Sequence, residues 1–156
     1  MSLPVKNGFT LVELIIVIVI MGIVSAVSAP KFFNMTIFEE RGYYDEVISA
    51  IRYAHKTAIA SGCNYKVSVN AAGYDITRHS NCSSGTFNAI TNPATGSIGG
   101  YTEIKPANIN VTGSFNFYYD NNGQPNDLSG NPMATSSISI ASRNITIESY
   151  TGFAHK

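Results

Sequence analysis

One carboxylate inside a long apolar run is the residue best placed to do chemistry near the start of this chain. From Phe9 to Ala29 the sequence runs for 21 residues, and Glu13 carries its only ionisable side chain. As a helix this segment rises about 32 Å, close to a bilayer core of about 30 Å. A carboxylate there costs about 2.5–3.5 kcal/mol at the bilayer centre and less near the interface. We therefore predict a membrane-spanning helix in which Glu13 awaits a partner.

The residues before the apolar run differ from a secretory signal peptide. A secretory signal places its apolar part before the cleavage site, so that part leaves with the peptide. Here residues 1–8 are polar, hold Lys6 as their one charge and end in Gly8. The apolar run would therefore stay in the mature chain. Lys6 before the apolar run agrees with the positive-inside tendency for a leader on the cytoplasmic side and the bulk of the chain across the membrane, although a single lysine carries little of this prediction.

Gly8-Phe9, Glu13 and Pro30 together resemble the type IV prepilin motif. The resemblance implies that a prepilin peptidase cuts between Gly8 and Phe9 and methylates the new N-terminal Phe9. It also implies that Glu13 pairs with this amine, in its own or a neighbouring subunit, and sets the register of a filament. Gly22 and Pro30 would bracket a segment that loses helical hydrogen bonds on assembly. The alternative to the prepilin motif is a single-pass anchor with a chance match. The alternative to a loss of helical hydrogen bonds is that membrane helices simply tolerate Gly and Pro.

The other residues that could act in catalysis or bind a metal form no predicted catalytic, cofactor or metal site. We therefore do not expect the protein to be an enzyme. Asp120-Asn121-Asn122-Gly123 and Asn126-Asp127 offer oxygen ligands, but they lack the spacing and terminal Glu of a calcium loop, which favours a side-chain-capped turn. The histidines are scattered along the chain without a nucleophile or a metal triad around them, at positions His55, His79 and His155.

Charge argues against nucleic acid as a partner. Ten Lys and Arg balance ten Asp and Glu, so no bulk positive field exists to attract phosphates. A resemblance to DNA-binding pilins of the FimT-like group would imply a basic C-terminal tail, whereas residues 151–156 hold a single lysine and no arginine. A DNA-binding competence pilin is therefore the weaker alternative.

Two cysteines, Cys63 and Cys82, lie beyond the apolar run. A chain carried out of the cytoplasm by a prepilin-like N-terminus folds where disulfides persist, so we predict that they pair. Two free buried thiols are the alternative.

Periodicity predicts an α+β fold, with a long N-terminal helix packed on a C-terminal antiparallel sheet. One helix is expected from about Phe9 to Ser61, apolar all round in its first half and amphipathic in its second, with Gly62 as its stop. Alternation predicts a hairpin around residues 70–73, a turn-rich loop over 80–100, and strands at 108–112, 114–119, 136–141 and 144–150. The expected organisation is a cleaved leader at 1–8, an assembly helix at 9–30 and a periplasmic globular domain at 31–156.

The later residues resemble the FimT and GspH group of minor pilins and pseudopilins. Phe115-x-Phe117 before a Gly123 turn, Ile138-x-Ile140 followed by Ile145-x-Ile147, and Thr151-Gly152 carry this match. Ala29-Pro30-Lys31-Phe32 is also similar to pilins of the mannose-sensitive haemagglutinin system.

The resemblance implies a minor pilin that primes or joins a type IV pilus, with a role in adhesion, motility or biofilm formation. Its partners would be other pilin subunits, the prepilin peptidase and an inner-membrane assembly platform. The chain would wait in the bacterial inner membrane, with its globular domain in the periplasm, before entering a filament on the cell surface. A type II secretion pseudopilin and a major pilin are the structural alternatives.

Overall fold

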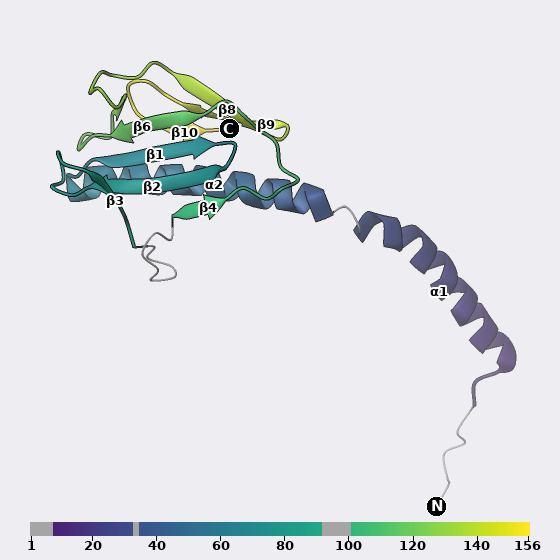
Figure 1. Ribbon diagram of the computed structural model, residues 1–156. Helices are drawn as coiled ribbons and strands as arrows, with labels where there is room; N and C mark the ends of the chain where they lie inside the picture. The colour runs from purple at the N-terminus through teal and green to yellow at the C-terminus, as the bar shows by residue number, and fades with distance from the viewer. Residues whose placement is uncertain (1–7, 33–34, 92–100) are drawn as a thin grey trace, which may run out of the picture. The chain divides into compact units, whose positions relative to one another are not determined.

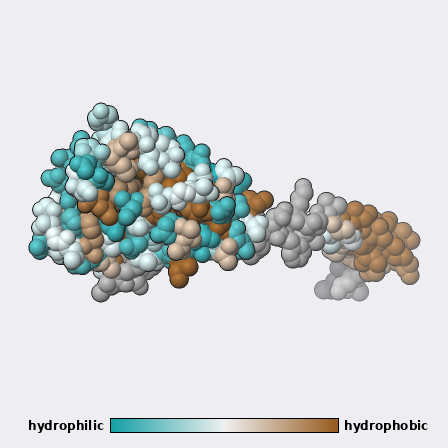
Figure 2. All heavy atoms as spheres, turned by 45° about the horizontal axis from the view of Figure 1, so that its top comes forward, coloured by the Kyte–Doolittle hydropathy of each residue, from teal (hydrophilic) through white to brown (hydrophobic). Residues whose placement is uncertain are grey.

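Helix α1, Leu11–Phe32, makes up most of the first of two units, Met1–Met35. The structure is a computed structural model that describes residues 8–32, 35–91 and 101–156. From Leu11 to Val24 the large apolar side chains of α1 are all between 44% and 75% exposed. Figure 2 shows the corresponding surface as an almost unbroken apolar area. Among the described helices, none combines the length and apolarity needed to cross a membrane.

Helix α2, Met35–Ser61, buries one stripe of side chains in the second unit, Thr36–Lys156. The amphipathic pattern predicted for this half of the helix is confirmed, because one stripe of side chains is buried: Tyr44, Val47, Ile48, Ile51, Ala54 and Ala58. Ile59 has the same helical spacing but is 50% exposed. Gly62 follows with φ 68°, the left-handed conformation that commonly ends a helix.

The expected single helix from Phe9 to Ser61 is represented by α1 and α2. Residues 33–34 between them lie outside the described residues, as do residues 1–7 of the expected leader. Helix α1 begins at Leu11 rather than Phe9, and Pro30 lies within it.

The chain after α2 forms two antiparallel sheets instead of the one we expected. The six-stranded sheet has the order β3-β2-β1-β6-β7, with β4 also paired to β2; its strands are β1 (Tyr65–Asn70), β2 (Gly73–His79), β3 (Phe87–Ala89), β4 (Thr102–Ile104), β6 (Phe115–Tyr119) and β7 (Pro125–Asn126). The four-stranded sheet has the order β10-β9-β8-β5; its strands are β5 (Val111–Thr112), β8 (Ser136–Ile140), β9 (Arg143–Ile147) and β10 (Ala154–His155). The second sheet arises because β8 and β9 pair with β5 and β10 rather than with β1 or β6.

A single hydrophobic core joins α2 to both sheets. In Figure 1, α2 runs along β1 and β2. Alternation along β6 points Phe115, Phe117 and Tyr119 into this core, where successive rings pack edge to face. The α+β prediction of a helix on antiparallel strands is confirmed.

Several predicted boundaries are wrong in detail. The segment expected to be a loop over 80–100 contains β3, which pairs with β2 from Thr77 to His79. Strand 108–112 shortens to β5, and strand 144–150 ends at Ile147, because the chain turns over residues 149–151 before β10. Residues 92–100 of the expected loop lie outside the described residues.

Candidate functional site

The first turn of α1 is organised by a side-chain cap. Thr10 precedes the helix, its Oγ1 accepts the backbone N–H of Glu13 at 3.2 Å, and its carbonyl accepts the N–H of Leu14 at 3.2 Å. Thr10 is therefore the N-cap and Glu13 the third helical residue, the Thr-x-x-Glu spacing of a capping box. A carboxylate in the first turn also interacts favourably with the helix dipole. The position of the Glu13 carboxylate therefore favours the start of α1, independently of the pairing that we expect for it.

The cap at Thr10 marks the N-terminal end of α1, so the preceding residues are not helical. Gly8, Phe9 and Thr10 are exposed and outside the helix, and the Phe9 side chain is 82% exposed. The Gly8–Phe9 peptide bond is consequently accessible in a non-helical segment, which is the geometry that a peptidase needs. Phe9 is joined to Gly8 by a peptide bond here, so the free amine that we expect Glu13 to pair with would exist only after a cut at this bond.

Gly22 contributes no packing contact to this subunit. A Cβ added at this position would meet no described atom within 4 Å. The glycine is therefore not required by packing among the described residues, which leaves helix flexibility or the close approach of another helix as reasons for it.

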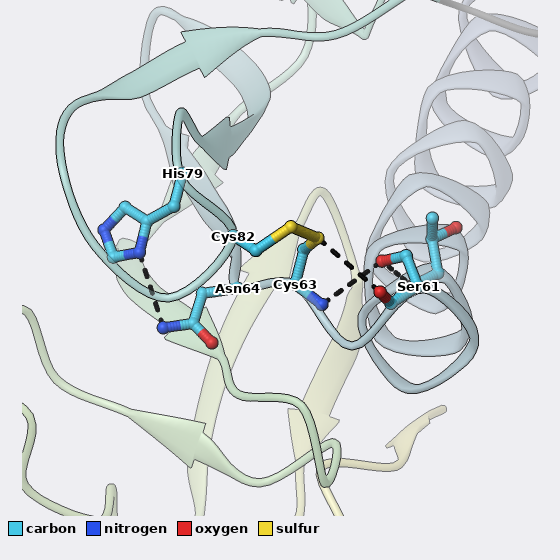
Figure 3. Close-up of a disulfide and its surroundings, with 6 residues drawn as sticks. Ser61, Cys63, Asn64, His79 and Cys82 are labelled. Atoms are coloured by element: carbon cyan, nitrogen blue, oxygen red, sulfur yellow. Dashed lines mark hydrogen bonds between the residues drawn. A yellow bond between two sulfur atoms is a disulfide. The ribbon is translucent and has the colours of Figure 1, made fainter.

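At the other end of the chain's helical part, Cys63 and Cys82 form a disulfide with an S–S distance of 2.03 Å (Figure 3). This confirms the predicted pairing. The backbone of Asn64, between the disulfide and β1, donates its N–H to the Cys82 carbonyl at 2.6 Å and accepts the His79 N–H at 3.1 Å. The Asn64 amide also lies 3.4 Å from Nδ1 of His79, as Figure 3 shows. The loop after β2 is thereby held against the end of α2.

Hydrogen bonds and ion pairs hold the C-terminal residues against the rest of the globular unit. Arg52 donates from Nε and Nη2 to the Ala154 carbonyl at 3.1 and 3.0 Å. His155 Nε2 lies 2.8 Å from a Glu148 oxygen, and this pairing raises the pKa of His155. Lys156 Nζ lies 3.3 Å from an Asp45 oxygen. Each basic group of the last two residues therefore faces a carboxylate.

The residues considered as a calcium loop instead cap two successive turns. Asp120 Oδ1 accepts the N–H groups of Asn122 and Gln124 at 2.9 and 2.8 Å. Asp127 Oδ1 accepts those of Ser129 and Asn131 at 2.8 and 2.9 Å. Hydrogen bonds from Asn131 are the main reason why the pKa of Asp127 is lowered. No cluster of three metal-ligating side chains occurs among the described residues.

His55, on α2, lies beside the turn at Gly123. An added Cβ at Gly123 would lie 2.7 Å from His55 Nε2, and Tyr119 packs beside the imidazole with ring centroids 4.9 Å apart. Burial lowers the pKa of His55, because it disfavours the charged form of the ring. His55, His79 and His155 occupy three different surroundings.

Comparison with known proteins agrees with the N-terminal geometry. Residues 4–29 match the family described as the prokaryotic N-terminal methylation motif. The chain is 42% identical over 52 residues to the "Type IV narrow pilus major component PilA5" of Thermus thermophilus. That match covers 33% of this chain and 45% of the relative, so it spans less than half of the relative's length. No solved structure matches the chain.

The chain thus carries the N-terminal methylation motif found in type IV pilins and is similar to a pilus component, which is a structural protein and not an enzyme. The type IV pilin resemblance is confirmed at this level. The minor-pilin subgroup stays a prediction.

Sequence reasoning missed two residues that the structure makes prominent. Thr10 could have been found from its Thr-x-x-Glu spacing before an apolar run. Arg52 could not, because its carbonyl partner lies 102 residues away in β10.

Proposed function

We propose that this chain is a minor pilin that primes or joins a type IV pilus through its N-terminal helix. The observation that carries the proposal is α1, whose apolar side chains are exposed on every side while one carboxylate sits in its first turn. Such a surface requires apolar surroundings, first those of a membrane and then those of neighbouring helices. The membrane-spanning role of residues 9–30 is part of this proposal.

Cleavage between Gly8 and Phe9, followed by methylation of Phe9, would prepare the helix for assembly. Support comes from the matched methylation motif and from the exposed, non-helical peptide bond. The cut creates a cationic amine four residues before Glu13. In an apolar bundle this amine and the Glu13 carboxylate would neutralise each other, since two separate charges there would be costly.

Substitutions at Glu13 separate its capping role from its pairing role. Glu13→Gln keeps a side chain that can hydrogen-bond in the first turn but removes the charge, whereas Glu13→Ala removes both. If pairing with the amine controls incorporation, both variants insert in the membrane and both are depleted from sheared filaments. Thr10→Val serves as the control, because it removes the cap and leaves the charge. Wild-type incorporation of Glu13→Gln, measured by immunoblot of sheared filaments, would contradict the pairing.

Copy number separates the pilus alternatives. A minor subunit is expected at a small fraction of the major subunit in sheared filaments, whereas a major subunit forms the bulk of them. A pseudopilin would instead be required for protein secretion, and its deletion would leave surface pili intact. The name of the similar Thermus protein, a narrow-pilus component, favours the pilus over the secretion system.

A further inference from the structure

A polar hollow of about 380 Å³ lies at the edge of the six-stranded sheet, and none of the residues in the C-terminal contacts lines it. Its lining comes from α2, β1, β2, β3 and the residues next to them: Tyr53, Tyr65, Arg78, His79, Ser80, Asn88, Ala89, Ile90 and Thr91. This volume falls within the range of small-ligand sites in proteins. Nothing in the proposed filament role uses this hollow.

The register of the strands brings three of these side chains into one row. Tyr65 is paired with Arg78, and Arg78 is paired with Asn88. Side chains directly opposite on antiparallel strands project from the same face, so the guanidinium and the amide lie side by side. Tyr65 is buried at the base of the row, whereas Arg78 and Asn88 are exposed. The row thus presents hydrogen-bonding groups to the hollow over an apolar base.

The lining carries positive charge without a carboxylate. It includes Arg78 but no aspartate or glutamate, whereas the hollow beside β4 contains both Asp75 and Glu103. Burial lowers the pKa of His79, and its ring nitrogens add hydrogen-bonding capacity to the lining. An anionic ligand is therefore favoured here over a cationic one.

An aromatic ring forms one wall. Tyr53, on α2, stacks on Tyr101 with ring centroids 4.5 Å apart and an interplanar angle of 17°. Stacking restricts the ring and so reduces the entropy lost when a ligand packs on it. A flat ring beside amide, hydroxyl and guanidinium groups suits a molecule with both C–H faces and hydroxyls.

We propose that this hollow binds a carboxylated saccharide, with Arg78 holding the carboxylate and Tyr53 lying along the sugar ring. Guanidinium and carboxylate match in a two-point hydrogen-bonded arrangement, which gives the carboxylate its advantage over a hydroxyl. Asn88, Ser80 and Thr91 supply donors and acceptors for the sugar hydroxyls. The site adds surface recognition to the protein whether or not the chain enters a filament.

The test compares D-glucuronate with D-glucose, which differ in the carboxylate at one carbon. Binding to the full-length protein in nonionic detergent micelles is measured by saturation-transfer NMR and by calorimetric titration. We expect saturable glucuronate binding and about 10-fold weaker glucose binding, as a charge-assisted contact provides. Arg78→Gln should reduce glucuronate binding about 10-fold, to the level of glucose, and leave glucose unchanged. Arg78→Lys should recover only part of the loss, because it keeps the charge but not the planar fork.

Arg41→Gln is the matched control, since Arg41 is an exposed arginine of α2 that does not line this hollow. It should bind glucuronate like the wild type. Equal binding of the two sugars by the wild-type protein would overturn the proposal. The same conclusion follows from equal losses in Arg78→Gln and Arg41→Gln, or from no saturable glucuronate binding up to about 10 mM.

Discussion

Reduction of the Cys63–Cys82 disulfide should lower the free energy of unfolding of the globular unit by about 3 kcal/mol. The two cysteines are 19 residues apart, and in the chain-entropy model the closure of a loop of this length removes about 11 cal/mol/K from the unfolded chain. For a unit of about 120 residues, 3 kcal/mol corresponds to a fall in Tm of about 12 °C. The fold itself should persist, because the hydrogen bonds of Asn64 to Cys82 and His79 do not depend on the disulfide.

The assay is urea unfolding of the full-length protein in nonionic micelles, followed by the near-ultraviolet circular dichroism of its tyrosines, with and without reductant. A change in midpoint with an unchanged slope identifies a change in stability alone. The Cys63→Ser/Cys82→Ser variant provides the control, since it should resemble the reduced protein and be insensitive to reductant. A loss below about 1 kcal/mol would refute the entropic reasoning and show that the loop stays closed in the unfolded chain.

Three further results are expected. His55 has a lowered pKa in the folded state, so its contribution to the free energy of unfolding should be complete above about pH 6.5. Below that pH the free energy of unfolding should fall by up to about 1.4 kcal/mol per pH unit, because the unfolded chain binds the proton more readily. Denaturation of the wild type and of His55→Gln from pH 4 to 8 checks this, and the variant should show the flatter profile. Arg52→Ala should cost about 2 kcal/mol by removing both hydrogen bonds to the Ala154 carbonyl, and hydrogen exchange should show β10 loosened, whereas Arg52→Lys should keep part of this protection. Gly152→Ala should lower the Tm measured by thermal denaturation, because φ is +64° and the new Cβ would lie 2.6 Å from the Tyr119 ring, whereas an unchanged Tm would show that the turn can shift.

Local patterns predicted most of the fold because each element carries its own signal. The stripe from Tyr44 to Ala58 has the helical period, and Phe115, Phe117 and Tyr119 have the strand period, so burial follows directly from spacing. The division into two sheets has no such signal. It depends on which strands pair over long distances, such as β5 with β8, and strands of two residues are too short to show alternation.

The position of the turn between β8 and β9 differs from the predicted one. The predicted strands at 136–141 and 144–150 leave the connecting turn between β8 and β9 around residues 142–144. The structure turns at Ala141 and Ser142, and Ala141 adopts φ 54° although it is not a glycine. The turn is instead enforced by the pairing of Ile138 with Ile145, which buries both side chains and so fixes the register. Packing here prevails over local preference.

The candidate assembly site was predictable because it is local in sequence. Gly8, Phe9 and Glu13 lie within six residues, and the cap at Thr10 lies among them. The polar hollow was not predictable, because Tyr53, Arg78 and Asn88 come together only through strand register and helix packing.

The cap at Thr10 gives the proposed cut a second consequence. Before cleavage, the first turn of α1 holds one negative charge, and apolar surroundings would oppose it from every side. After cleavage, the amine of Phe9 lies just before the capped turn, and methylation keeps that amine cationic. The start of the helix then changes from a net negative charge to neutrality without any change in the apolar surface that follows. The proposed cut would therefore do more than remove residues 1–8, because it would convert a helix whose charge disfavours an apolar bundle into one whose charges can be satisfied there.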